Sequence, residues 1–220
     1  MNYIDSALRV PFSLASTLRR ARVFHAHGVV AQGHAELGSH WWPVQGRVPV
    51  TVRLSRGVGL PGSVPDILGL SIRLHLAARP WDLLLASTDP VTRFLPCPAL
   101  SWSTAQYSSL NAFRTPDNDS RTWVLASPDA GQPRTASLNA LSTADPLHFT
   151  LSLARSRSDT TAAGRLSLET PVSIGDDEEQ PDFDPVLHHP DGLEMWPEWV
   201  ADARRAAYSG SRSGRHSVDA

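Results

Sequence analysis

The chain has 220 residues, with 20 basic and 22 acidic side chains, a formal charge of −2 and one cysteine. This length fits one domain with a substantial hydrophobic core. Because the chain is nearly neutral, it has no general electrostatic attraction to nucleic acid or to an anionic membrane surface, and we expect neither as a partner. The single cysteine excludes an internal disulfide.

The beginning of the chain bears on where the protein works. Met1–Asp5 carries an acid where a secretory signal would be basic, and no long apolar run follows it. No stretch reaches the roughly 20 apolar residues that a membrane helix needs. The sequence therefore predicts a soluble, cytoplasmic protein with no membrane span.

The first half of the chain consists mainly of predicted strands. Residues 1–20 predict an N-terminal arm, and residues 22–37 predict a strand, a glycine turn and a second strand. The clearest strand is Val48–Ser55, in which apolar residues alternate with others, and Leu68–Leu76 alternates again. Trp81–Ser87 is a compact apolar run that fits a buried strand.

The second half is less regular. Residues 101–110 fit either a helix or irregular chain, whereas residues 116–121 and 127–133 are rich in turn formers and predict loops. His148–Arg155 and Gly164–Leu168 predict two strands of a hairpin joined by a Ser, Thr and Asp loop.

The C-terminal part predicts a connector and then a helix. Residues 175–195 begin with an acidic, proline-containing stretch that predicts an exposed connector. Helix-forming residues on helical spacing predict a helix within 196–215. Many strands followed by one helix indicate an α+β, mainly β fold, in which an antiparallel β-barrel is closed by the C-terminal helix. We expect one domain over residues 1–220.

Several short stretches, taken in order, resemble the haem catalase superfamily. Arg22–Gly28 reads Arg-Val-Phe-His-Ala-His-Gly and is similar to the family's distal motif. Val52–Ser55 resembles the next core strand, Asp66–Arg73 the segment after it, and Trp81–Leu83 the start of the strand that carries the family's distal asparagine. Near the C-terminus, the matching residues are Phe183, Asp184, Pro185, Arg204, Tyr208 and Arg215.

The resemblance implies a catalase-like β-barrel with haem b as its cofactor and a C-terminal proximal helix. It makes His25 the distal acid–base residue, with Ser55 hydrogen-bonded to the far nitrogen of its imidazole and Phe24 beside it in the pocket. It makes Tyr208 the axial iron ligand, with Arg204 next to it. The haem propionates would pair with three arginines, Arg22, Arg53 and Arg215.

These residue types suit the implied chemistry. A free tyrosine has a pKa of about 10, and both a ferric ion and a nearby guanidinium favour the phenolate form that ligates iron. Arg204 and Tyr208 are four residues apart and so are neighbours on one helix face. A neutral His25 could take a proton from a bound hydroperoxide and return it to the leaving oxygen, which assists cleavage of the O–O bond.

The sequence also departs from the family. The distal asparagine is missing, and Ser87 or Thr88 stands near its place, so we expect weak or no true catalase activity. The implied function is a haem oxidoreductase that uses hydrogen peroxide or an organic hydroperoxide with a small organic substrate. It could work as a peroxidase, a peroxygenase or a hydroperoxide-rearranging enzyme. The chain is far shorter than a full catalase, and a homodimer is one assembly that such a barrel could form.

Three alternatives stay open. His25 and His27 could form a two-histidine metal site. The chain could bind haem without turnover, in transport or sensing, which requires Tyr208 but not His25. A barrel of this kind could also have lost haem and bind another ligand. An absorption spectrum of the purified protein would distinguish the hypotheses in which haem is bound from the hypothesis that haem has been lost.

Overall fold

The structure is a computed structural model. It describes residues 28–57, 64–89, 95–115, 118–144, 146–156, 158–169, 171–173 and 181–197. Arg53 and Ser55 are the predicted site residues within these ranges. The other predicted site residues lie outside the described residues: Arg22, Phe24, His25, Arg204, Tyr208 and Arg215.

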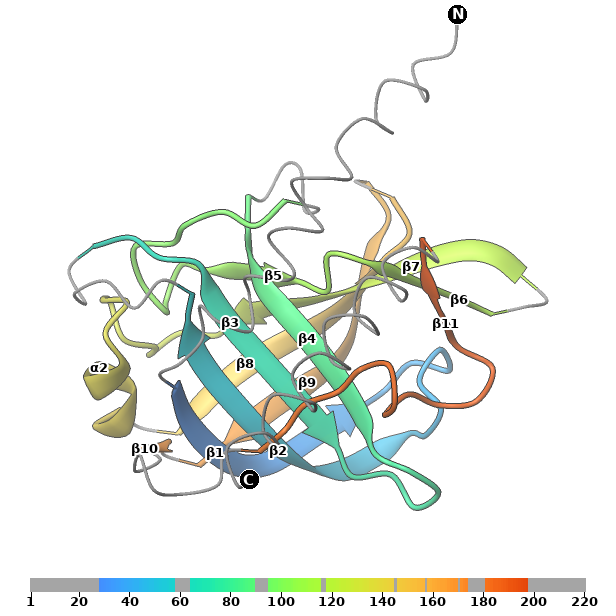
Figure 1. Ribbon diagram of the computed structural model, residues 1–220, viewed down its shortest axis with the longest axis horizontal. Helices are drawn as coiled ribbons and strands as arrows, with labels where there is room; N and C mark the ends of the chain where they lie inside the picture. Colours follow the sequence, from blue (N-terminus) through green and yellow to red (C-terminus); the bar gives the residue numbers. More distant parts are fainter. Residues whose placement is uncertain are drawn as a thin grey trace, which may run out of the picture.

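Within the described ranges, eight strands form a closed antiparallel barrel, drawn in Figure 1. In order around the barrel they are β1 (Gly28–Leu37), β2 (Gly46–Arg56), β3 (Leu68–Leu74), β4 (Trp81–Thr88), β5 (Gln106–Ser108), β7 (Asn118–Pro128), β8 (Leu147–Ala154) and β9 (Thr160–Leu168). Pairing of β9 with β1 closes the ring. The remaining elements are β6 (Ala112–Thr115), β10 (Val172–Ser173), β11 (Glu194–Trp196) and the short helix α2 (Leu138–Ser142). The antiparallel barrel that the sequence predicts is confirmed.

Side-chain alternation explains how β2 builds the barrel wall. Val50, Val52 and Leu54 point inward and are completely or almost completely buried. Inward-facing residues of the neighbouring strands, such as Leu70 and Ile72 on β3, complete the core. The barrel interior is therefore filled by apolar side chains, as in other small barrels.

Gly33 lies within a continuous strand. Residues 28–37 form β1, while residues 22–27 of the predicted strand, glycine turn and strand lie outside the described residues. A Cβ atom on Gly33 would collide with the backbone oxygen of Ser167 on β9. Gly33 therefore allows β1 and β9 to approach closely.

Strands also occur in regions for which the sequence predicts loops, or a helix or irregular chain. Strand β5 lies within residues 101–110, and β7 overlaps both predicted loops at 116–121 and 127–133. Thr122, Val124 and Ala126 alternate as buried residues on β7, but the turn formers around them hide this pattern in the sequence. The predicted hairpin of β8 and β9 is confirmed, although β9 begins at Thr160 and not at Gly164.

The C-terminal segment, residues 181–197, lies against the outside of the barrel (Figure 1). The sequence predicts an exposed connector here, but Phe183 and Asp184 are buried. The segment ends in β11, which pairs with β6. Trp196, where the predicted helix begins, is the last residue of β11, and residues 198–215 of that helix lie outside the described residues.

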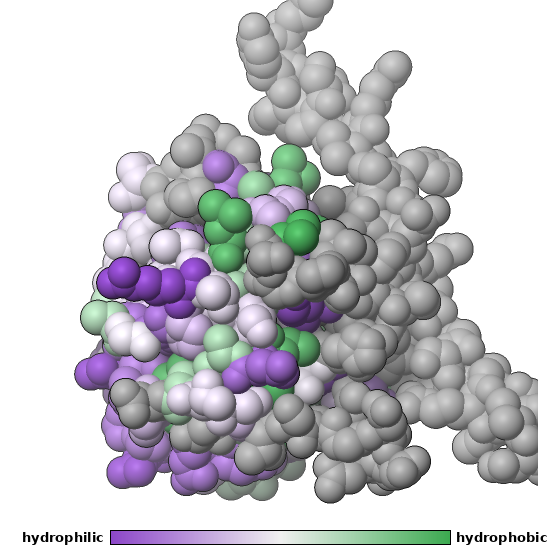
Figure 2. Space-filling view, turned by 90° about the vertical axis from the view of Figure 1, so that its left-hand side faces the viewer, coloured by the Kyte–Doolittle hydropathy of each residue, from purple (hydrophilic) through white to green (hydrophobic). Residues whose placement is uncertain are grey.

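The surface of the described residues has no broad hydrophobic area on the side that Figure 2 shows, where hydrophobic residues form small separate groups among hydrophilic ones. The large hydrophobic side chains that are exposed are Val44, Val64, Leu95, Leu100 and Leu187. Among the described residues, no helix has the length and apolar composition needed to cross a membrane.

Candidate functional site

The two described site residues lie on the outer face of β2. Because Val52 and Leu54 fill the interior, Arg53 and Ser55 must point away from it. Strand pairing aligns Ser55 with residues on the neighbouring strands, and aligned residues point to the same side of a sheet. The aligned set, which we name the Ser55 row, is Gly28, Ser55, Gly69, Ala86 and Ser108.

The Ser55 row consists of small residues, of which Ser55, Gly69 and Ser108 are buried and Gly28 and Ala86 are partly buried. It contains no side chain larger than serine. Ser55 is 2% exposed and Ser108 is 0% exposed, although both face away from the barrel interior. This end of the outer face is therefore a buried surface, which is unusual for a barrel exterior.

Arg53 places a positive charge at the edge of this surface. Its side chain is 9% exposed. A Cβ atom on Gly28 would lie 2.9 Å from both Cζ and Nε of Arg53, so the guanidinium lies directly against the glycine backbone. Burial lowers the pKa of the Arg53 guanidinium, because less water stabilises its charge.

The strand register decides which residues of β4 share a face with Ser55. Ala86 pairs with Gly69 and so belongs to the Ser55 row, while Ser87 points to the opposite side of β4. The Ser87 hydroxyl accepts a bond from the Leu68 N–H at 2.9 Å and donates to the Cys97 carbonyl at 2.7 Å. The Ser87 hydroxyl therefore faces away from Ser55 and is already engaged in two hydrogen bonds.

Thr88 remains on the face of Ala86, two residues further along β4. Its hydroxyl donates to the backbone carbonyl of Gln106 at 3.4 Å. Neither alanine nor this engaged threonine offers the free amide of an asparagine. The described part of this face thus supplies hydroxyls and a guanidinium.

A second charged group lies on the same face of β4. The carboxylate of Asp82 is 0% exposed and accepts two hydrogen bonds of 2.7 Å from Arg73 on β3. It also contacts Nδ1 of His188 at 2.8 Å. The sequence reasoning missed this cluster. The available sign was an acid in the otherwise apolar run Trp81–Ser87, and its histidine partner lay in a segment predicted as a loop.

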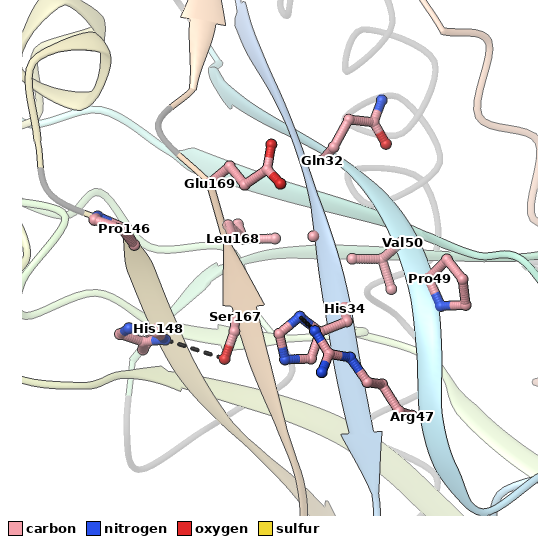
Figure 3. Close-up of a pocket in the computed structure, with 11 residues that line it drawn as sticks. Gln32, His34, Arg47, Pro49, Val50, Pro146, His148, Ser167, Leu168 and Glu169 are labelled. Atoms are coloured by element: carbon pink, nitrogen blue, oxygen red, sulfur yellow. Dashed lines mark hydrogen bonds between the residues drawn. The ribbon is translucent and has the colours of Figure 1, made fainter.

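The outer face also carries an open groove of about 730 Å³ at the other end of β1 and β2. Figure 3 shows His148 facing Ser167, with Nδ1 and Oγ 3.1 Å apart, and the guanidinium of Arg47 beside the ring of His34. Arg47 donates to Nδ1 of His34 at 3.1 Å, so this ring carries its proton on Nε2 when neutral. The other lining residues are Gln32, Gly33, Pro49, Val50, Pro146, Leu168 and Glu169.

This groove is distinct from the Ser55 row. Pro49 in the groove and Ser55 lie six positions apart on β2, which corresponds to roughly 20 Å along a strand. The groove mixes charges, because Arg47 lines it together with Glu169. It therefore does not favour a ligand of either charge.

Within the described ranges, no group of three or more His, Cys, Asp or Glu side chains could hold a metal ion. The alternative of a metal site at His25 and His27 concerns residues outside these ranges. The structure thus brings Arg53 and Ser55 together on one buried face, and the remaining predicted site residues stay predictions.

Comparison with solved structures identifies the fold. A fungal catalase crystal structure matches with a TM-score of 0.59 and 15% sequence identity over 82% of this chain. Catalase A from Saccharomyces cerevisiae matches with a TM-score of 0.61 and 16% identity over 85% of this chain. The fold is catalase-like.

These comparisons concern architecture. This chain spans 56% and 59% of the two catalase chains, so it corresponds to little more than half of either. No protein-family model matches the sequence, and neither does any curated protein. The catalase-like barrel agrees with the resemblance seen in the sequence, while an activity has to be argued from the residues.

Proposed function

We propose that this protein is a haem-dependent oxidoreductase that uses hydrogen peroxide or an organic hydroperoxide, with haem b bound on the outer face of the barrel near Arg53 and the Ser55 row. The observation that carries this proposal is the buried guanidinium of Arg53 beside a surface of small residues, on the outside of a catalase-like barrel. Bound haem would supply the iron at which peroxide reacts.

The described residues fit such a cofactor. The Ser55 row offers a surface of small residues to a macrocycle, and the interior of the barrel offers no space because core side chains fill it. Arg53 would pair with a propionate through a charge-assisted hydrogen bond. Arg22 and Arg215 would hold the propionates together with it.

On the distal side, His25 would take a proton from the bound peroxide and return it to the departing oxygen. Ser55 would accept or donate the hydrogen bond that orients this imidazole, since its hydroxyl lies on the correct face of β2. Phe24, beside His25 in sequence, would narrow the pocket and keep it apolar. Each of these roles for His25 and Phe24 comes from the family resemblance.

On the proximal side, Tyr208 would ligate the iron as a phenolate, and Arg204 would stabilise its negative charge. The absence of an amide in the Ser55 row argues against efficient disproportionation of hydrogen peroxide. We therefore expect peroxidase, peroxygenase or hydroperoxide-rearranging activity toward a small organic substrate, with weak or no catalase activity. A cytoplasmic location and a homodimer stay predictions from the sequence.

A titration with haemin tests the cofactor. We expect a 1:1 complex with a strong absorption band that shifts on adding cyanide and changes in Tyr208→Phe. Arg53→Met should weaken haemin binding about tenfold or more, because a hydrogen bond to a charged group contributes roughly 1.5–3 kcal/mol. Arg47→Met removes an arginine from the open end of the same face and serves as the matched control, with unchanged affinity.

A substitution of His25 distinguishes a haem enzyme from a haem-binding protein without turnover. In His25→Ala, peroxidase turnover should fall by at least about a hundredfold while haemin remains bound, as for loss of a general acid–base. Unchanged turnover would favour the second candidate, a haem-binding protein for transport or sensing. The missing amide at Ala86 is the observation that keeps this candidate open. A protein that takes up no haemin would contradict both.

A further inference from the structure

The buried carboxylate of Asp82 joins the barrel to the C-terminal segment. From the barrel, it accepts hydrogen bonds from Nε and Nη2 of Arg73, both at 2.7 Å. From the segment, it accepts a bond of 2.7 Å from the Asp184 N–H and lies 2.8 Å from Nδ1 of His188. The backbone N–H of Asp82 also donates to the His188 carbonyl at 2.9 Å.

The partners of Asp82 are themselves held in place. Arg73 donates a further bond of 2.6 Å to the Asp182 carbonyl, and its guanidinium lies 5.2 Å from the centre of the Phe183 ring. Its hydrogen bonds to Asp82 raise the pKa of Arg73, despite the opposing effect of burial. The Asp184 carboxylate accepts hydrogen bonds from the backbone N–H groups of Val186 and Leu187, at 3.0 and 3.1 Å.

The geometry also indicates the proton position on His188. Nδ1 lies 2.8 Å from the Asp82 carboxylate and 3.1 Å from Nη2 of Arg73. Arginine can only donate, so an unprotonated Nδ1 would suit Arg73 but would face the carboxylate with its lone pair. The shorter distance to Asp82 favours a proton on Nδ1 that is donated to the carboxylate. His188 thus adds a directed bond to the cluster.

Net stability is a weak explanation for this arrangement. A buried ion pair contributes little compared with apolar packing of the same volume, since both charges lose water. The ion pair does fix the relative orientation of the groups it joins, because the donors must meet the carboxylate at defined angles. A second attachment of the segment, the pair of Arg114 on β6 and Glu194 on β11, is much more exposed.

The position of Asp82 relates this attachment to the proposed site. Asp82 lies on the same face of β4 as Ala86, four residues away, or about 13 Å along the strand. The segment that it holds runs to residue 197, eleven positions before Tyr208 in the sequence. We infer that Asp82, with Arg73 and His188, is a positioning residue that sets where the chain carrying Tyr208 leaves the barrel relative to the Ser55 row. Only the role of Tyr208 in this inference rests on the proposed function.

The first test measures the segment without haem. Hydrogen exchange in Asp82→Asn should become at least tenfold faster for amides in residues 182–190, with unchanged exchange in β1 and β2. Glu194→Gln removes the carboxylate of the exposed pair on the same segment and should change exchange at 182–190 less than twofold. His188→Ala should act in the same direction as Asp82→Asn with a smaller effect, and it covers the case in which Asp82→Asn does not fold.

The second test measures position. Spin labels at Thr161→Cys and Ser209→Cys, in a Cys97→Ser background, report the distance between the barrel and the neighbour of Tyr208. We expect the distance distribution to broaden at least twofold when Asp82→Asn or His188→Ala is added, and to stay unchanged with Glu194→Gln. An unchanged distribution with both cluster variants would overturn the inference. Faster exchange at 182–190 without any change in distance would do the same, because Asp82 would then be an anchor without influence on Tyr208.

Haemin binding distinguishes this inference from the proposed function. If the wild-type protein takes up haemin, the absorption band of Asp82→Asn should shift or broaden, as Tyr208→Phe is expected to do. If the wild-type protein takes up none, the proposed function fails, while the exchange and distance measurements still decide the role of Asp82.

Discussion

The two faces of β2 differ in a way that locates the candidate site. Leu54 points into the barrel and is completely buried, whereas its neighbours Arg53 and Ser55 point outward and are still buried. Further along the same outer face, Arg47 and Pro49 are exposed at the open groove. The inner face of β2 therefore belongs to the packed core. Its outer face is buried and polar near Ser55 and open to solvent near Arg47.

This difference separates stability from binding. The inner face is filled, so it holds the barrel together and leaves no room for a ligand. The buried end of the outer face presents a cation and small residues, which is what a planar, carboxylate-bearing ligand requires. Substitutions at adjacent positions of β2 should consequently have different effects, and four predictions follow this contrast from the largest expected effect to the smallest.

Leu54→Ala tests the inner face. Removal of a fully buried leucine side chain leaves a cavity, and such substitutions cost about 2–5 kcal/mol of unfolding free energy. Urea unfolding followed by tryptophan fluorescence should show this loss. Haemin affinity, measured where the variant is fully folded, should stay within about twofold of wild type. A selective loss of haemin binding without a loss of stability would contradict the assignment of the two faces.

Gly33→Ala and Gly28→Ala compare two glycines on β1. The new methyl group at position 33 would meet the backbone of β9, which cannot move easily, and overpacking of this kind typically costs about 1–3 kcal/mol. At position 28 it would meet the end of the flexible Arg53 side chain. We therefore expect Gly33→Ala to lower the urea midpoint strongly, and Gly28→Ala to alter haemin binding with little change in stability. The reverse pattern would count against a ligand beside Gly28.

Tyr107→Phe tests a polar atom inside the barrel. The Tyr107 hydroxyl has no hydrogen-bond partner among the described residues, and burial raises the pKa of this phenol far above its ordinary value. In the unfolded protein this phenol ionises above a pH of about 10, and its ionisation stabilises the unfolded state. The stability that the buried, protonated phenol preserves is therefore present below that pH and is lost as the pH rises further. The phenylalanine variant should match or slightly exceed wild type at pH 7 and should lose less stability at pH 11. Urea midpoints at both pH values provide the check, and a loss of more than about 1 kcal/mol at pH 7 would indicate a hidden hydrogen bond.

The open groove should give the smallest effect. Arg47→Ala and His34→Ala remove side chains that are exposed or half-buried, and surface changes of this kind usually shift stability by less than about 0.5 kcal/mol. Haemin affinity should not change, since these residues lie far along the strand from Ser55. A clear loss of haemin binding in either variant would move the candidate site to the groove.

Local patterns in the sequence determined much of the barrel. Alternation in Val48–Ser55 and Leu68–Leu76 predicts strands that the structure confirms, because side chains on a strand alternate between its two faces whatever lies beyond it. The compact apolar run Trp81–Ser87 also lies in a strand. The same rule places Arg53 and Ser55 on one side of β2. The pattern is harder to see in β7, where Asn, Asp and Ser surround the buried residues and pairing with three other strands compensates for weak local preference.

The tertiary structure alone decided which residues meet across strands. Pairing register puts Ala86, and not Ser87, beside Ser55, and a shift of one residue would have reversed that result. It also brings His188 to Asp82 across 106 positions of sequence. Such contacts depend on how distant segments pack, which local composition does not encode. The sequence by itself therefore determined the strands and their faces, while packing decided which face is buried and what lies next to it.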